Sequence, residues 1–268
     1  MKWILLVGTA CLWFTQLSHA ATYVRYQAGD DIQYAERRGD ALYPISGDIF
    51  SSFEVSTNSL PIDDVELLLP TQPEKVFAVG MNFASHLASR SSAPPPIFLK
   101  LPSSLAVSGE KLLMPSDATN VHFEGELVLV IGKTLTEANE SEASAAIFGV
   151  TAGNDLTERN WQGSDLQWVR AKASDGFGPI SPEIITDIDH TDVVITTKLN
   201  GKTVQQESTK NMIHSAAKVV SYLSQYYTLK PGDLIFMGTP GRTKALSDGD
   251  VVDVSIGNYT QVSNQIAF

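Results

Sequence analysis

Cysteine is almost absent from this sequence of 268 residues, in which it occurs only once. That residue, Cys11, lies in an apolar N-terminal segment that we expect to be removed from the mature protein. A mature chain without cysteine has no disulfide, no thiolate ligand for a metal and no cysteine nucleophile. Such a chain must be held together by a hydrophobic core, and about 250 residues are enough to form one.

Positive charge is also scarce. The chain has 19 Lys and Arg against 30 Asp and Glu, which gives a formal net charge of −11 and a pI near 4.8. This balance argues against nucleic acid or an anionic membrane surface as a partner. It leaves room for a local cationic pocket that binds a small anion.

Long apolar runs are missing as well, and the most apolar stretch is residues 4–14. It follows Lys2, is broken by Gly8, and is followed by the small residues of a signal-peptidase site at 18–20. It is too short and too interrupted to span a bilayer comfortably, so an uncleaved anchor is the weaker alternative. We therefore predict a signal peptide at 1–20 and a protein that is exported, either periplasmic or secreted, without membrane contact after cleavage.

The remaining sequence predicts more strand than helix. Residues 21–70 read as short strands and turns, which predicts a small N-terminal β subdomain followed by a catalytic unit at 71–268. Strands are predicted at 75–80, 147–152, 234–237 and 251–256, and a hairpin at 192–206 around Asn200-Gly201. Helices are predicted at 137–146 and 212–226. This balance favours an α+β fold that is mainly β.

Two glutamates stand two positions apart in the strand-like run 121–131. Because side chains alternate across a strand, Glu124 and Glu126 share a face, and both faces of this run are otherwise apolar. Two buried carboxylates need a compensating cation, and a divalent metal with oxygen ligands is the simplest one. Alternatively, the first half of the strand is frayed and the glutamates are solvated; the residues alone favour neither reading.

Other polar side chains follow predicted strands. Asp155 could complete a three-carboxylate metal site, although aspartate at such a position is often a helix N-cap. Lys172 lies in a turn-rich stretch, where a lone lysine is usually solvated; near a metal-bound anion it would instead be a cationic anchor. Thr239 lies in a Gly-Thr-Pro-Gly loop that could present backbone N–H groups to an anion or be only a turn. His86, in a polar loop, has the chemistry of a general base.

Taken together and in order, these segments resemble the fumarylacetoacetate hydrolase family. The stretches that carry the resemblance are GMNFASH (80–86), PIFLK (96–100), FEGEL (123–127), NDLTER (154–159), residues 171–182, the hairpin at 200–206 with Gln206, and residues 231–240. The resemblance implies a mixed β-sandwich or β-roll of the type of that family's C-terminal domain, commonly as a homodimer.

The same resemblance implies the chemistry. A divalent ion, Mg²⁺ or Mn²⁺ with Ca²⁺ as an alternative, would be bound by Glu124, Glu126 and Asp155. The substrate would be a small 2-oxo acid, and His86 and Lys172 would be the catalytic residues. The residues that would hold the acid's carboxylate and carbonyl are Arg159, Gln162, Lys172 and Thr239.

One departure from the family pattern concerns the reaction itself. Hydrolytic members pair the loop histidine with a glutamate three residues later, but that position is Ser89 here; a smaller departure is Asn160 in place of an aspartate. We expect hydrolysis of a C–C bond in an acylpyruvate-like 2,4-dioxo acid. The alternatives are a metal-dependent decarboxylase or tautomerase of an oxaloacetate-like substrate, and an exported protein that binds a 2-oxo acid without turnover.

Overall fold

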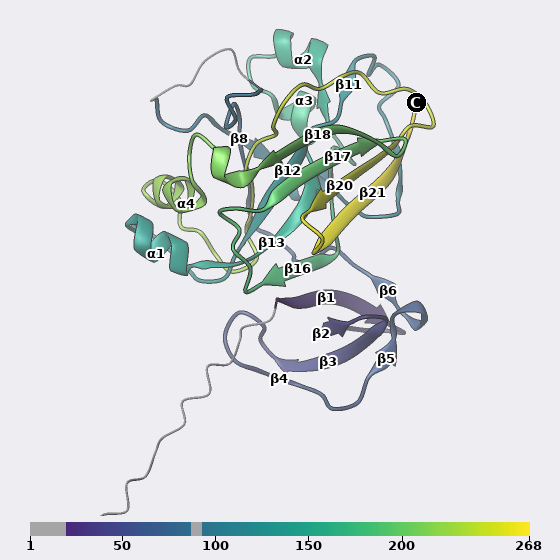
Figure 1. The fold of residues 1–268 in the computed structure, drawn as a ribbon, viewed down its shortest axis with the longest axis vertical. Helices are drawn as coiled ribbons and strands as arrows, with labels where there is room; N and C mark the ends of the chain where they lie inside the picture. Colours follow the sequence, from purple (N-terminus) through teal and green to yellow (C-terminus); the bar gives the residue numbers. More distant parts are fainter. Residues whose placement is uncertain (1–19, 87–92) are drawn as a thin grey trace, which may run out of the picture.

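A computed structural model describes residues 20–86 and 93–268 (Figure 1). The predicted signal peptide and Ser89 lie outside the described residues, so both interpretations stay predictions. The described part is an α+β fold that is mainly β, as predicted. No helix in these two ranges has both the length and the apolar character to cross a membrane.

The first strands form a small antiparallel sheet, drawn in purple below the main body in Figure 1. Its strands are β1 (Ala21–Ala28), β2 (Asp31–Arg38), β3 (Ala41–Gly47), β4 (Phe53–Val55), β5 (Leu60–Pro61) and β6 (Glu66–Leu67). Val24, Tyr26, Ala35 and Leu42 form its own small core. Strand β1 also pairs with β16 (Glu183–Thr186), which joins this sheet to the main body.

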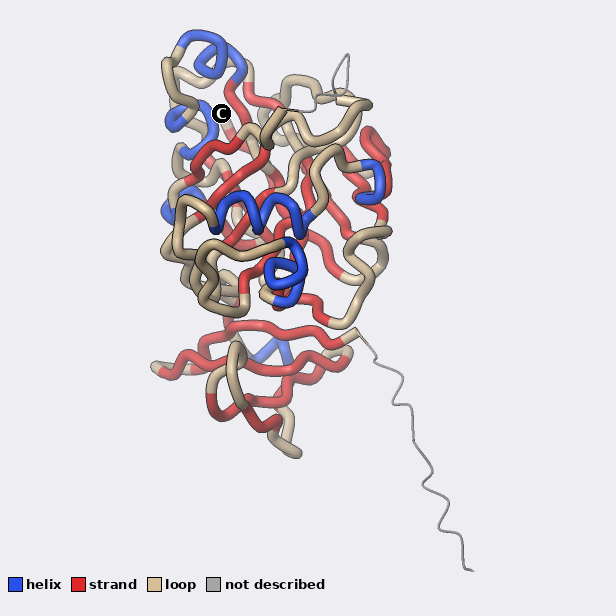
Figure 2. Tube along the Cα trace, turned by 90° about the vertical axis from the view of Figure 1, so that its left-hand side faces the viewer, coloured by secondary structure: helices blue, strands red, loops and turns tan. Residues whose placement is uncertain are grey.

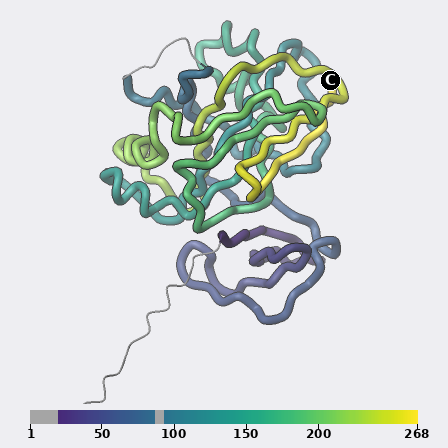
Figure 3. The backbone as a smooth tube through the Cα atoms, in the orientation of Figure 1, coloured from purple at the N-terminus to yellow at the C-terminus, as the bar shows by residue number. Residues whose placement is uncertain are grey.

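Two sheets pack face to face in the main body (Figures 1 and 2). The larger continues from β16 through β13 (Ile147–Asn154), β12 (Gly125–Ile131), β19 (Leu234–Phe236), β7 (Val76–Val79) and β8 (Ile97–Lys100). The second has the order β10 (Lys111–Leu113), β21 (Thr260–Ala267), β20 (Val251–Ile256), β17 (Val194–Leu199) and β18 (Lys202–Ser208). Figure 3 shows the yellow C-terminal strands returning to this body, away from the N-terminal sheet. The main core lies between the sheets.

Four short strands complete the connections around this core. Strand β9 (Leu105–Val107) runs parallel to β15 (Gly178–Ile180), which pairs with β13. Strand β11 (Val121–His122) pairs with β14 (Thr157–Glu158). The strand predicted at 121–131 is therefore interrupted: β11 ends before Phe123, and β12 begins at Gly125. All seven residues of β12 are buried between β13 and β19, which confirms the predicted burial on both faces.

The predicted helices exist but begin later than expected. Helix α1 (Glu140–Ala145) begins after Asn139, whose side chain accepts from Ser141 and Glu142 in a capping box. Glu137 has a φ of 49°, which is not helical and so excludes it from the helix. Helix α4 (Ala216–Ser224) begins at the cap Ser215. Helices α2 (Arg159–Ser164) and α3 (Val169–Ala173) lie beside the site described below.

The crossing of β13 and β16 leaves no room for a side chain at Gly149. A Cβ built there would meet the backbone oxygen of Ile185 at 2.6 Å, and backbone cannot easily move away. We expect Gly149→Ala to lower the free energy of unfolding by about 2 kcal/mol. Urea unfolding followed by circular dichroism measures this difference.

Gly163→Ala is the matched control, because nothing lies within 4 Å of a Cβ at that position in α2. Alanine favours a helix over glycine, so this variant should be as stable as the parent or up to about 1 kcal/mol more stable. Equal unfolding free energies for the two variants would contradict the packing described here.

Candidate active site

Three carboxylates meet where β12 begins and β13 ends. One oxygen each from Glu124, Glu126 and Asp155 lies within 4.8 Å of the others, and all three residues are buried. Strand pairing produces this meeting: Glu126 lies opposite Gly153 in the β12–β13 ladder, and the Asp155 amide donates to the Glu124 carbonyl at 2.8 Å. The alternative of two solvated glutamates on a frayed strand is therefore wrong.

Two buried lysines compensate these carboxylates. Lys172, in α3, donates from Nζ to Glu124 Oε2 and to Asp155 Oδ2, each at 2.6 Å. Lys100, at the end of β8, donates to Asp155 Oδ1 at 2.7 Å and to the carbonyls of Phe177 and Lys172. Lys172 was a predicted site residue, whereas Lys100 was not assigned a role from sequence.

The pKa values of the two glutamates are shifted in opposite directions. Burial raises the pKa of Glu126 well above its ordinary value, and the nearby Asp155 and Glu124 raise it further. Burial also acts to raise the pKa of Glu124, but Lys172 and Arg159 outweigh it and lower that pKa to about 2. Burial opposes the charge of Lys172, yet Asp155 and Glu124 raise its pKa. Glu124 is thus ionised and Lys172 charged, while Glu126 tends to keep a proton.

These residues fit a divalent metal. Three carboxylates at the bottom of a pocket are hard oxygen ligands of the kind that Mg²⁺ and Mn²⁺ prefer. Burial and the neighbouring carboxylates Asp155 and Glu124 raise the pKa of Glu126, and a bound cation would favour its ionised form. Glu124, Glu126 and Asp155 are therefore the residues that would hold such an ion.

The predicted substrate-binding residues surround the same pocket. Arg159, the first residue of α2, donates to Glu124 Oε1 at 2.5 Å and to Gln162 Oε1 at 2.9 Å. Thr239, which follows β19, is buried and accepts from Gln205 Nε2 at 3.0 Å. The pocket has a volume of about 50 Å³, and its lining residues include Glu124, Glu126, Arg159, Gln162, Lys172, Thr239 and His86. The structure therefore brings every predicted site residue except the buried Asp155 to one surface.

His86 is held by backbone. Its Nδ1 lies 2.6 Å from the carbonyl oxygen of Gly241, and because a carbonyl only accepts, Nδ1 carries the proton. In the neutral ring, the lone pair then lies on the other nitrogen, Nε2. The neighbouring Ser85 hydroxyl donates to Glu207 and accepts from the Gly241 amide. A carboxylate is therefore near this loop, but it contacts Ser85 and not the imidazole.

Three further details concern the N-cap of α2, the two glutamines of β18 and the loop after β19. The N-cap of α2 is Glu158 and not Asp155, because the side chain of Glu158 accepts from the Trp161 amide at 2.7 Å. Gln206 is exposed, and its neighbour Gln205 is the glutamine that points inward. The Gly238 amide donates to an oxygen of the chain's own Glu126 carboxyl group, at 2.7 Å.

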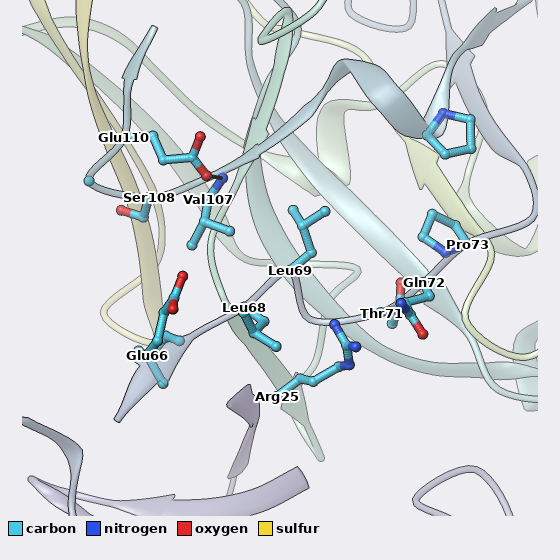
Figure 4. A pocket seen from close by; sticks show the side chains of 13 residues that line it. Arg25, Glu66, Leu68, Leu69, Thr71, Gln72, Pro73, Val107, Ser108 and Glu110 are labelled. Atoms are coloured by element: carbon cyan, nitrogen blue, oxygen red, sulfur yellow. Dashed lines mark hydrogen bonds between the residues drawn. The ribbon is translucent and has the colours of Figure 1, made fainter. Parts of the chain in front are cut away.

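A larger hollow of about 610 Å³ lies between the N-terminal sheet and the main body (Figure 4). Its charged side chains are Arg25, Glu66 and Glu110, and Leu68 and Leu69 lie between them. It shares no residue with the carboxylate pocket. The chemistry of the chain is therefore concentrated in the smaller pocket.

Fold and pocket together define a β-rich protein with a buried three-carboxylate centre flanked by cations. Residues 75–267 match the family described as fumarylacetoacetate (FAA) hydrolase C-terminal, and residues 22–70 match one described as Rv2993c-like, N-terminal. The chain belongs to the fumarylacetoacetate hydrolase family.

Two relatives are similar in sequence over most of this chain. Protein Rv2993c of Mycobacterium tuberculosis is 39% identical over 214 residues, which are 78% of this chain and 81% of that protein. The mitochondrial oxaloacetate tautomerase FAHD2A of Bos taurus is 33% identical, over 77% of this chain and 71% of that protein.

Solved structures agree with the fold. A 2-hydroxyhepta-2,4-diene-1,7-dioate isomerase from Mycobacterium marinum superposes with a TM-score of 0.86 at 34% identity, over 92% of this chain and 98% of that one. A fumarylpyruvate hydrolase from Pseudomonas aeruginosa, in complex with Mn²⁺ and pyruvate, has a TM-score of 0.69 at 28% identity, over 80% and 93%.

The raised pKa of Glu126 predicts that metal binding releases a proton. In the metal-free protein this carboxyl stays protonated above the pH at which an exposed glutamate ionises, and a metal ligand must be deprotonated. The apparent affinity for Mn²⁺ should therefore rise with pH and level off once Glu126 has lost its proton. Calorimetric titrations in two buffers of different ionisation enthalpy, between about pH 5 and pH 8, measure the release.

Glu126→Gln provides the comparison for this prediction. Glutamine keeps the size of the side chain but has no proton to lose, so the variant should bind Mn²⁺ more weakly and with a smaller buffer dependence. The prediction is contradicted if the parent protein gives the same binding enthalpy in both buffers below neutral pH.

Proposed function

We propose that this protein is a metal-dependent enzyme that interconverts the keto and enol forms of a small 2-oxo acid. The observation that carries the proposal is the contact of His86 Nδ1 with the Gly241 carbonyl in place of a carboxylate. A carbonyl orients an imidazole and fixes its tautomer, but it has no full negative charge with which to stabilise an imidazolium. Reversible transfer of one proton requires less stabilisation of the His86 imidazolium than sustained activation of water does.

Each residue has a role in binding. Arg159 and Gln162 hold the substrate carboxylate, and Thr239 closes the far side of the pocket. When bound, a divalent ion supplies Lewis acidity at the 2-oxo carboxylate. Lys172 keeps its proton because Asp155 and Glu124 raise its pKa, so its N–H groups can stabilise negative charge on the substrate oxygen.

The proton itself is moved by His86. The free lone pair on Nε2 accepts the proton from the carbon next to the 2-oxo group, and the electron pair of that C–H bond forms the C=C bond of the enol. The imidazolium then returns the proton to the oxygen, and the reverse sequence restores the keto form. No atom is gained or lost, and no water is consumed. The 33% sequence identity to a protein named oxaloacetate tautomerase supports tautomerisation as the reaction.

Hydrolysis of an acylpyruvate C–C bond is the second candidate. The tautomer that Gly241 imposes on His86 leaves Nε2 available, which is also what a water-activating base requires. The similarity to a fumarylpyruvate hydrolase supports this reading. Decarboxylation of oxaloacetate would use the same binding residues and differs by the release of CO₂.

One assay separates these reactions. Purified protein with Mn²⁺ is mixed with oxaloacetate and, separately, with acetylpyruvate. Tautomerisation predicts faster decay of the enol ultraviolet band of oxaloacetate without pyruvate or CO₂. Pyruvate and acetate from acetylpyruvate would favour hydrolysis, and CO₂ from oxaloacetate would favour decarboxylation. Binding of pyruvate without turnover of either compound would favour the non-catalytic binding protein.

Asp155→Asn tests the centre itself. The amide keeps the shape of the side chain but lacks the charge that a metal ligand needs, so Mn²⁺ binding should be lost and kcat/KM should fall by about a hundredfold or more. Asp165→Asn is the control, since Asp165 contacts Arg170 and Ser164 outside the pocket and its loss should change kcat/KM by less than about twofold. Full activity in Asp155→Asn would refute the assignment.

Ser89→Glu tests the missing loop acid. If the absence of a carboxylate partner limits water activation by His86, then adding one should raise hydrolysis of acetylpyruvate while the rate of enol decay changes less. Ser89→Gln, which adds the same bulk without charge, is the control. An equal gain in both variants would attribute the effect to bulk.

A further inference from the structure

A second hollow adjoins the carboxylate pocket. It is a groove of about 470 Å³ between the edge strand β8, the segment that leads into α3, and the residue Tyr227 beyond α4. Its lining consists of Phe77, Pro96, Ile97, Phe98, Leu99, Leu166, Gln167, Trp168, Val169 and Tyr227. We call this set the apolar groove.

The apolar groove and the carboxylate pocket share a wall. Phe98 and Trp168 line both hollows, and their rings meet edge to face with centroids 5.5 Å apart. On the pocket side, Lys172 Nζ lies 4.9 Å from the centroid of the Phe98 ring. The ammonium that pairs with Glu124 and Asp155 is therefore separated from the groove by one aromatic layer.

The two hollows differ in size and in charge. The carboxylate pocket, at about 50 Å³, has room for the head of a 2-oxo acid and little more. The groove is larger, and none of the described residues that line it is charged. Its surface includes apolar side chains in water: Leu166 is fully exposed, Leu99 is 53% exposed and Val169 is 42% exposed. These exposed apolar side chains line one groove, and pockets that bind small molecules are lined mainly by apolar and aromatic side chains.

We propose that the apolar groove receives the tail of the substrate, and that this tail is an uncharged hydrocarbon chain. The inference rests on the proposed function, because the head of the same molecule occupies the carboxylate pocket. A tail that leaves this pocket past Phe98 and Trp168 enters a groove whose described lining residues offer apolar contact and no cation. A second, distal carboxylate would lose water there without gaining a partner. The isomerase from Mycobacterium marinum is named for a dioate, so its substrate differs from the one proposed here.

The first test is a series of binding measurements. Calorimetry gives the Kd of the Mn²⁺-loaded protein for straight-chain 2-oxo acids from pyruvate to 2-oxooctanoate. Affinity should rise about twofold to fourfold per added methylene, the range between half and full burial. 2-Oxosuberate, which has the length of 2-oxooctanoate but ends in a carboxylate, should bind at least about tenfold more weakly than 2-oxooctanoate.

The outcomes distinguish the two levels of the proposal. If pyruvate binds but the Kd does not change with chain length, the groove proposal is overturned while the proposed function stands. If neither pyruvate nor a longer acid binds to the Mn²⁺-loaded protein, the proposed function itself fails. Preference for 2-oxosuberate over 2-oxooctanoate would also overturn the uncharged tail.

A variant pair locates the effect in the groove. Val169→Asp places a charge in the lining, at the first position of α3, where aspartate is compatible with a helix. The ratio of pyruvate Kd to 2-oxooctanoate Kd should fall about tenfold. Val194→Asp is the matched control, since Val194 is 39% exposed, begins β17 and is not part of the groove. This control should keep the parent ratio.

Two further variants keep the test decisive. Leu99→Asp introduces the same charge from β8, so it replaces Val169→Asp if that protein does not fold. Val169→Arg should instead favour 2-oxosuberate. Sedimentation of each variant is measured alongside: if Val169→Asp changes the mass of the particle but leaves the selectivity for chain length intact, the groove is a contact between copies of this chain and the substrate-tail proposal is overturned.

Discussion

Five ionisable side chains are buried together, and the surrounding strands and helix hold them in contact with one another. Glu124, Glu126 and Asp155 are brought together by the pairing of β12 with β13, and each would be costly to bury without a partner. Lys172 and Lys100 reach them from α3 and β8, two elements that approach from the other side. Removing one member would leave an uncompensated buried charge, so the sheet, the short helix and the edge strand are energetically coupled.

The sequence was informative wherever a local period decides the outcome. Alternation along the run 121–131 predicted that Glu124 and Glu126 share a face, and the unbroken apolar run predicted the burial of β12 correctly. Lys100 shows where prediction from local sequence fails. A lone lysine at the end of a strand is usually solvated, and the partners that make this one a buried residue are Asp155 and carbonyls of residues 172 and 177. Such long-range partners leave no local pattern.

A bulge determines which glutamine of β18 is buried. Thr197 lies opposite Gln205, whereas the next residue, Lys198, lies opposite Thr203, so β18 contains one extra residue near the turn. Counting alternate residues outward from Asn200-Gly201 therefore reverses the two faces beyond this point, and Gln205 rather than Gln206 is buried. The orientation of His86 was equally inaccessible. Its partner was sought as a carboxylate within the same loop, but the contact is a backbone carbonyl 155 residues away.

The carboxylate centre alone does not select a reaction, because relatives named as isomerase, tautomerase and hydrolase share this fold. Binding and activating a 2-oxo acid is common to all of these chemistries, so the choice among them must come from groups at the edge of the centre. Here those groups are an imidazole that a neutral carbonyl orients and an aromatic wall that opens on an uncharged groove. In the function proposed here, the first would limit the strength of the base, and the second would limit the charge of the substrate tail. Both features restrict the substrate without altering the residues that would hold the metal, which allows specificity to change while the coupled charges stay intact.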